Sequence, residues 1–132
     1  MADRNPTIVV ADDEPHIRMM MKVVLARGGF DVVGEASNGR EAIEKCRLLR
    51  PDLVLLDINM PIQNGDEALA EILKDLPGIA AIMFTSVADS MTVERCIEMG
   101  AVNYLRKDAP VQQISEMVKQ TWQEWRSRGG EP

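Results

Sequence analysis

Short apolar runs alternate along the chain with longer segments of amphipathic pattern. The runs at residues 8–11, 53–56, 82–84 and 104–105 lead to polar or charged residues, which are Asp12 and Asp13, Asp57, Thr85 and Lys107 respectively. A further short run covers residues 31–34. Short buried strands that alternate with helices are typical of a parallel sheet with helices on both faces. The pattern therefore predicts five strand-helix units.

The amphipathic segments have apolar residues at three- and four-residue spacings and clear terminal signals. We expect helices from Pro15 to Gly28, over 42–49 before Pro51, from Asn64 to Pro77, about 91–99 before Gly100, and from Pro110 to about Arg126. Proline is harmless at a first helical position, and glycine commonly follows a last one. The apolar stripes of the second and fourth helices include Leu49 and Ile97, which are expected to face the core.

The chain has 132 residues, of which 45% are hydrophobic, enough for one core and too few for two ordinary domains. We expect a single domain over residues 7–126, with flexible termini at 1–6 and 127–132. No apolar stretch reaches membrane-spanning length and residues 1–6 do not resemble a signal peptide, so a cytoplasmic location is expected.

Cys46 and Cys96 fall on apolar stripes and are expected to be buried free thiols. A net charge of -6 argues against direct binding of nucleic acid.

The polar residues at the strand ends predict a site. In open α/β sheets, ligands bind outside the carboxyl ends of the strands, so three carboxylates, a hydroxyl and an ammonium group should meet in one crevice. Carboxylates about 5 Å apart repel by roughly 3 kcal/mol at an effective dielectric constant of 20. They must therefore hold protons or a cation, and hard oxygen ligands favour Mg²⁺. His16 is more consistent with a solvated residue in a first helical turn than with a ligand.

These residues, in this order, resemble the receiver domain of two-component response regulators. The resemblance covers roughly residues 7–126 and includes Met60, Pro61 and Gly65, which follow Asp57. It implies a flavodoxin-like fold, in which a doubly wound five-stranded parallel sheet of strand order 2-1-3-4-5 is flanked by five helices.

The resemblance also implies a reaction. Asp57 would accept a phosphoryl group from a phosphohistidine of a sensor histidine kinase or phosphotransfer protein, forming an acyl phosphate. The implied Mg²⁺ ligands are Asp12, Asp13, Asp57 and the backbone carbonyl of Asn59. The domain would catalyse its own phosphorylation and dephosphorylation, and it would not be an enzyme acting on a separate substrate.

Further roles are implied for residues around the phosphoryl group. Lys107 and Thr85 would bind its oxygens, and Tyr104 would take part in a switch of the surface formed by the fourth helix, fifth strand and fifth helix. Asn59 and Val87 would border the water that hydrolyses the acyl phosphate. Because valine cannot orient that water, dephosphorylation is expected to be slower than with a polar residue at position 87. Receivers commonly have a cis proline after the lysine, but Asp108 follows Lys107 here, so a trans peptide bond is expected.

The output of the domain has alternatives. It would act on a downstream protein, or it would be the receiver of a longer helix-turn-helix transcription regulator, and it is a possible homodimer. An aspartyl-phosphate phosphatase is the competing enzyme class, but Asn59 stands where a second acid would be needed. A flavin carrier is disfavoured because Asp12, Asp13 and Glu14 would repel its phosphate. A purely structural domain would have no reason to gather these groups.

Overall fold

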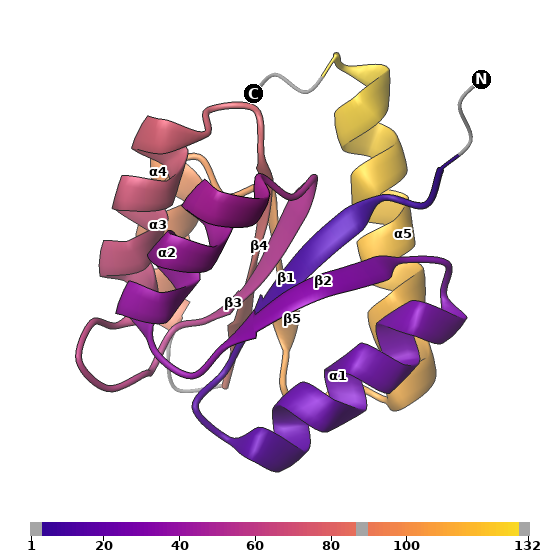
Figure 1. Ribbon diagram of the computed structural model, residues 1–132, viewed down its shortest axis with the longest axis horizontal. Helices are drawn as coiled ribbons and strands as arrows, with labels where there is room; N and C mark the ends of the chain where they lie inside the picture. The colour runs from indigo at the N-terminus through magenta and orange to yellow at the C-terminus, as the bar shows by residue number, and fades with distance from the viewer. Residues whose placement is uncertain (1–3, 87–89, 130–132) are drawn as a thin grey trace.

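A parallel five-stranded sheet lies at the centre of the computed structural model, which describes residues 4–86 and 90–129. The strands are β1 (Thr7–Ala11), β2 (Asp31–Ala36), β3 (Leu53–Asp57), β4 (Ala80–Thr85) and β5 (Asn103–Arg106). Their order in the sheet is β2-β1-β3-β4-β5, which confirms the expected 2-1-3-4-5 topology. Helices α1 and α5 cover one face and α2, α3 and α4 the other (Figure 1).

The helices lie close to the positions that the sequence predicts. They are α1 (Pro15–Arg27), α2 (Gly39–Leu49), α3 (Gly65–Asp75), α4 (Ser90–Met99) and α5 (Val111–Ser127). Local signals fix several ends: Pro15 is the first residue of α1, and the Asn38 side chain accepts a 2.9 Å hydrogen bond from the Glu41 N–H at the start of α2. None of the helices in the described ranges is both long and apolar enough to cross a membrane.

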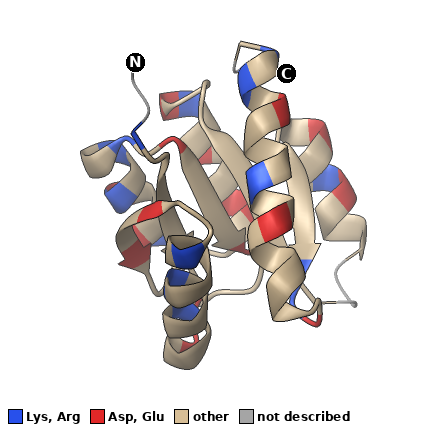
Figure 2. Cartoon of the chain, turned by 90° about the vertical axis from the view of Figure 1, so that its right-hand side faces the viewer, with Lys and Arg blue, Asp and Glu red and all other residues tan. Residues whose placement is uncertain are grey.

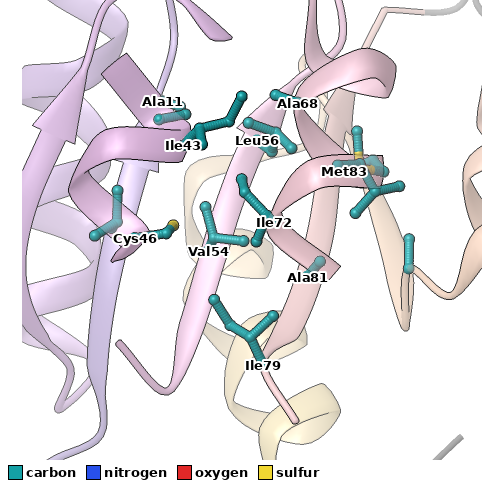
Figure 3. Packing of buried hydrophobic residues seen from close by; sticks show 14 of the residues in the cluster. Ala11, Ile43, Cys46, Val54, Leu56, Ala68, Ile72, Ile79, Ala81 and Met83 are labelled. Carbon is teal, nitrogen blue, oxygen red and sulfur yellow. The ribbon is translucent and has the colours of Figure 1, made fainter. Parts of the chain in front are cut away.

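Apolar side chains fill both spaces between the sheet and its helices. On the side of α2, α3 and α4, strand residues such as Val54, Leu56 and Met83 pack against Ile43, Ile72 and their neighbours (Figure 3). On the other side, Leu55, Ile82 and Phe84 pack with residues of α1 and α5. Because β1, β3 and β4 are covered on both faces, their sequences are apolar except at one end of each strand, as in other buried parallel sheets.

The prediction that Leu49 and Ile97 face the core is wrong for both residues. Leu49 is 37% exposed and Ile97 is 40% exposed. Leu49 comes last in α2, where its side chain lies over Gly34 of the edge strand β2 and leaves its outer side in water. Ile97 lines a cavity between α4 and β5. A three-to-four-residue spacing places a residue on a helix face, but it does not say how far the neighbouring layer extends.

The two cysteines are buried free thiols, as expected. Burial raises the pKa of the Cys46 thiol to about 12 and, with the charge of Asp66, that of Cys96 to about 11, so both stay protonated at neutral pH. The peptide bond between Lys107 and Asp108 is trans, which is also as expected. In the view of Figure 2, acidic and basic positions are interspersed along the helices.

Candidate functional site

The register of the parallel sheet gathers the polar residues at the carboxyl ends of four strands. Asp57 pairs with Phe84 across β3 and β4, and Thr85 pairs with Arg106 across β4 and β5. The Lys107 N–H extends the last ladder by donating a 2.7 Å hydrogen bond to the Thr85 carbonyl. Residues that are far apart in the sequence therefore meet at one edge.

Three aspartates form the acidic part of this edge. One carboxylate oxygen from each of Asp12, Asp13 and Asp57 lies within 4.8 Å of the other two. Asp12 and Asp57 are buried, whereas Asp13 is exposed. Buried carboxylates this close repel strongly unless protons or cations compensate them. The arrangement can hold a metal ion whose remaining coordination sites open to solvent.

Lys107 supplies part of the compensation. Its Nζ atom lies 3.1 Å from Asp12 Oδ2 and 3.1 Å from Asp57 Oδ2. These two oxygens are buried and accept no well-oriented hydrogen bond within the described part of the chain. Buried oxygens with spare acceptor capacity are suitable ligands for a hard divalent cation. The donor set therefore fits Mg²⁺.

The charges in the site perturb one another. Burial, with the nearby charge of Asp12, raises the pKa of Asp57 from 3.8 to about 6, although Lys107 and the Asn59 N–H act in the opposite direction. Burial alone would lower the pKa of Lys107, but the close ionic contacts with the Asp57 and Asp12 carboxylates outweigh this effect, and the pKa is raised. Lys107 is therefore a cation at neutral pH, and Asp57 loses its proton at a higher pH than an ordinary aspartate does.

The other expected site residues lie at different distances from this centre. The Asn59 N–H donates a 3.2 Å hydrogen bond to Asp57 Oδ1. The buried Thr85 hydroxyl donates a 3.0 Å hydrogen bond to the Ser86 carbonyl. His16 is largely exposed in the first turn of α1, with Nε2 3.7 Å from a Glu14 carboxylate oxygen. Val87 lies outside the described residues.

Tyr104 points away from the core at the edge of a cavity. Its side chain is 44% exposed. The cavity has a volume of about 590 Å³ and is lined by Thr85, Ser86, Ser90, Val93, Glu94, Ile97, Glu98, Tyr104 and Arg106. Thr85 and Tyr104 thus share one hollow between the candidate site and the surface of α4 and β5.

A close backbone contact places the start of α3 against the end of β3. A Cβ atom on Gly65 would overlap the carbonyl oxygen of Asp57, and the Gly65 N–H donates a 2.6 Å hydrogen bond to the Ile58 carbonyl. Only glycine fits such an approach without moving the backbone. Gly65 therefore fixes the loop that carries Asn59.

Sequence reasoning missed Arg18. Its Nη1 donates a 2.8 Å hydrogen bond to the carbonyl oxygen of Asp12, and its Nε donates a 2.8 Å bond to Glu35 Oε1. The one available signal was an arginine five residues after an acidic pair, a common arrangement at the start of solvated helices.

Comparisons with known proteins agree with this geometry. The model of the response regulator receiver domain family matches residues 8–119. The chemotaxis protein CheY of Thermotoga maritima is 36% identical over 111 residues, which are 84% of this chain and 92% of CheY. The transcriptional regulatory protein LnrK of Bacillus subtilis is 38% identical over 112 residues, which are 84% of this chain but 51% of LnrK. The chain thus spans about half the length of that regulator.

Solved structures show the same fold. A CheY-like receiver domain protein from Methanospirillum hungatei superposes with a TM-score of 0.87 at 27% identity, covering 94% of this chain and 98% of that one. The response regulator domain of Thermotoga maritima CheB superposes with a TM-score of 0.80 at 32% identity, covering 92% of this chain and 96% of that one. With strand order, strand-end aspartates and the family match in agreement, the chain belongs to the response regulator receiver domain family.

Proposed function

We propose that this receiver domain accepts a phosphoryl group on Asp57 in a reaction that depends on Mg²⁺. The observation that carries the proposal is the pair of buried oxygens, Asp12 Oδ2 and Asp57 Oδ2, that face the single ammonium group of Lys107. A buried cluster of this charge, open on the side of Asp13, is poorly explained by structural needs alone.

The bound cation would be held by Asp12, Asp13, Asp57 and the backbone carbonyl of Asn59, and it would neutralise charge on the phosphoryl oxygens. The donor would be a phosphohistidine of a sensor histidine kinase or phosphotransfer protein. An Asp57 carboxylate oxygen forms a bond to phosphorus while the bond from phosphorus to the histidine nitrogen breaks, and the imidazole leaves with that electron pair. The reaction needs Asp57 without its proton.

Three further residues would respond to the new phosphoryl group. Lys107 would pair with its oxygens, and the Thr85 hydroxyl would exchange its bond to the Ser86 carbonyl for one to the phosphate. Tyr104 borders the same cavity as Thr85, which supports its proposed movement inward. Such a change would alter the surface of α4, β5 and α5 and hence binding of a downstream protein or output domain, or formation of a homodimer.

Loss of the phosphoryl group is proposed to involve Asn59 and Val87, which would border the attacking water. The Asn59 amide can orient a water molecule, whereas the Val87 side chain cannot. We expect a polar side chain at position 87 to shorten the lifetime of the acyl phosphate.

Mass spectrometry tests the phosphoacceptor. The intact protein is incubated with acetyl phosphate in Mg²⁺ and, as a control, in EDTA. The wild type is expected to gain one phosphoryl group in Mg²⁺ but not in EDTA. Asp57→Asn is expected to gain none in either buffer. Asp75→Asn, which changes an aspartate at the end of α3, should be modified like the wild type. An equal mass gain in Asp57→Asn would contradict the proposal.

A further inference from the structure

Arg18 links α1, β2 and the loop after β1. It lies in the first part of α1, and only 16% of its side chain is exposed. One guanidinium nitrogen holds the Asp12 carbonyl and another holds Glu35 on β2, both at 2.8 Å. Arginine is rarely buried to this extent unless it is paired, and its fixed fork of donors suits two acceptors at once.

The acceptor of the first bond matters because it belongs to the peptide between Asp12 and Asp13. Two other polar groups of Asp12 are also engaged in hydrogen bonds: its N–H donates to the Ala36 carbonyl at 3.0 Å, and its Oδ1 accepts a 2.9 Å bond from the Glu14 N–H. A rotation of the peptide that follows Asp12 would move both neighbouring carboxylates. The Arg18 bond therefore restrains two of the three acids of the site.

Glu35 in turn holds Arg18. Its second oxygen, Oε2, lies 2.7 Å from Lys22 Nζ, one turn further along α1. The hydrogen bonds from Lys22 and Arg18 lower the pKa of Glu35, so this carboxylate stays charged and balances the guanidinium. Because Arg18 is already paired, its main effect on the acidic cluster is through position and not through repulsion of a bound cation.

We propose that Arg18 is a positioning residue for the metal site, which keeps the Asp12 and Asp13 carboxylates in the geometry needed to bind Mg²⁺. This inference rests on the proposed function, since it presupposes that the cluster binds Mg²⁺. Partners that orient metal ligands commonly change metal affinity about 10- to 100-fold when they are removed.

Calorimetric titration of the full chain with Mg²⁺ tests the inference, with urea unfolding in EDTA measured for each variant. Arg18→Met should weaken Mg²⁺ binding about tenfold, and Arg18→Lys should weaken it too, because an ammonium group keeps the charge but not the two-acceptor fork. Lys22→Met is the matched control: it removes the other ion pair to Glu35 and should leave Mg²⁺ affinity within about twofold.

The outcomes separate the alternatives. If Arg18→Met is folded and binds Mg²⁺ as tightly as the wild type, or more tightly, the inference is wrong. If Arg18→Met does not fold, Arg18→Lys decides, and wild-type affinity there would reject the role. A wild-type protein that binds no Mg²⁺ would instead overturn the proposed function itself. NMR shifts of the Asp12 and Asp13 amides, perturbed by Arg18→Lys but not by Lys22→Met, would support the mechanism independently.

Discussion

The ammonium group of Lys107 lies 3.1 Å from the Oδ2 atom of Asp57, a buried residue that is only 2% exposed. Asp12 Oδ2 lies equally far from the same nitrogen. Without a metal ion, this lysine is thus the cation that lets two buried acids coexist. With a metal ion and a phosphoryl group, the same lysine would be released to bind phosphate oxygens.

Lys107→Ala should therefore destabilise the metal-free protein. Removing one partner of a buried ion pair leaves uncompensated charge, and a loss of about 2 kcal/mol is expected at pH 7.5. Added Mg²⁺ should restore part of the loss, because the cation replaces the missing charge. Urea unfolding in EDTA and in Mg²⁺ measures both effects, with the exposed Lys74→Ala on α3 as control. Equal destabilisation in the two buffers would contradict this account.

Lys107→Ala should also weaken signalling more than it weakens modification. Lys107 would contact the product oxygens, so its loss removes stabilisation of the phosphorylated conformation. We expect the variant to gain a phosphoryl mass with acetyl phosphate, while beryllofluoride, a phosphoryl mimic, causes smaller NMR shifts in α4 and α5 than in the wild type. NMR shifts as large as those of the wild type would show that Lys107 takes no part in the switch.

The stability of the metal-free protein should depend on the protonation of Asp57. Because its pKa rises from 3.8 to about 6 on folding, the folded protein binds this proton more tightly than the unfolded chain does. The resulting stabilisation is present below about pH 4 and is lost as the pH rises through 6. The free energy of unfolding of Asp57→Asn, whose side chain stays neutral, should thus exceed that of the wild type by about 2 to 3 kcal/mol at pH 7.5.

The comparison of Asp57→Asn with wild type should be made by urea unfolding in EDTA from pH 4 to 8. The difference should be small at pH 4 and reach its full value above pH 7. The exposed Asp31→Asn serves as control. A difference that does not change with pH would mean that Asp57 is not protonated near pH 6.

Gly65→Ala should disturb the site through the backbone. The added methyl group would overlap the Asp57 carbonyl oxygen, so α3 or the end of β3 must move, and a loss of about 1 to 3 kcal/mol is expected. Gly78→Ala is the matched control, because a methyl group there would meet no atom within 4 Å. Thermal unfolding of the two variants compares them directly, and similar melting temperatures would show that the contact is easily relaxed.

Ile62 is strained in the loop between Asp57 and α3. Its φ angle is 68°, its side chain is 77% exposed, and the Gln63 N–H donates a 2.7 Å hydrogen bond across it to the Pro61 carbonyl. A positive φ is unfavourable for a β-branched residue, whereas asparagine tolerates it. Ile62→Asn should therefore stabilise the fold by about 1 kcal/mol. Ile62→Val keeps the β-branched side chain and should not stabilise the fold. Equal free energies of unfolding for the two variants would therefore argue against strain.

The sequence by itself determined the strands and helices and proposed which strand-end residues form the candidate site. The apolar runs defined five strands, local signals such as Pro15 and Asn64 marked helix starts, and the residues that follow the strands were identified as candidate site residues, namely the acids, Thr85 and Lys107. Such features are encoded by neighbouring residues, and the carboxyl ends of parallel strands must share one edge.

The tertiary structure alone decided which side chains meet. The register of β1, β3, β4 and β5 brings Lys107 between two aspartates, and the packing of α1 against β2 carries Arg18 to the Asp12 carbonyl. The exposure of Ile97 likewise reflects the cavity between α4 and β5 that its side chain lines. Periodicity fixes the direction of a side chain relative to its own helix or strand, whereas its partners depend on the distance and rotation between elements that are remote in sequence.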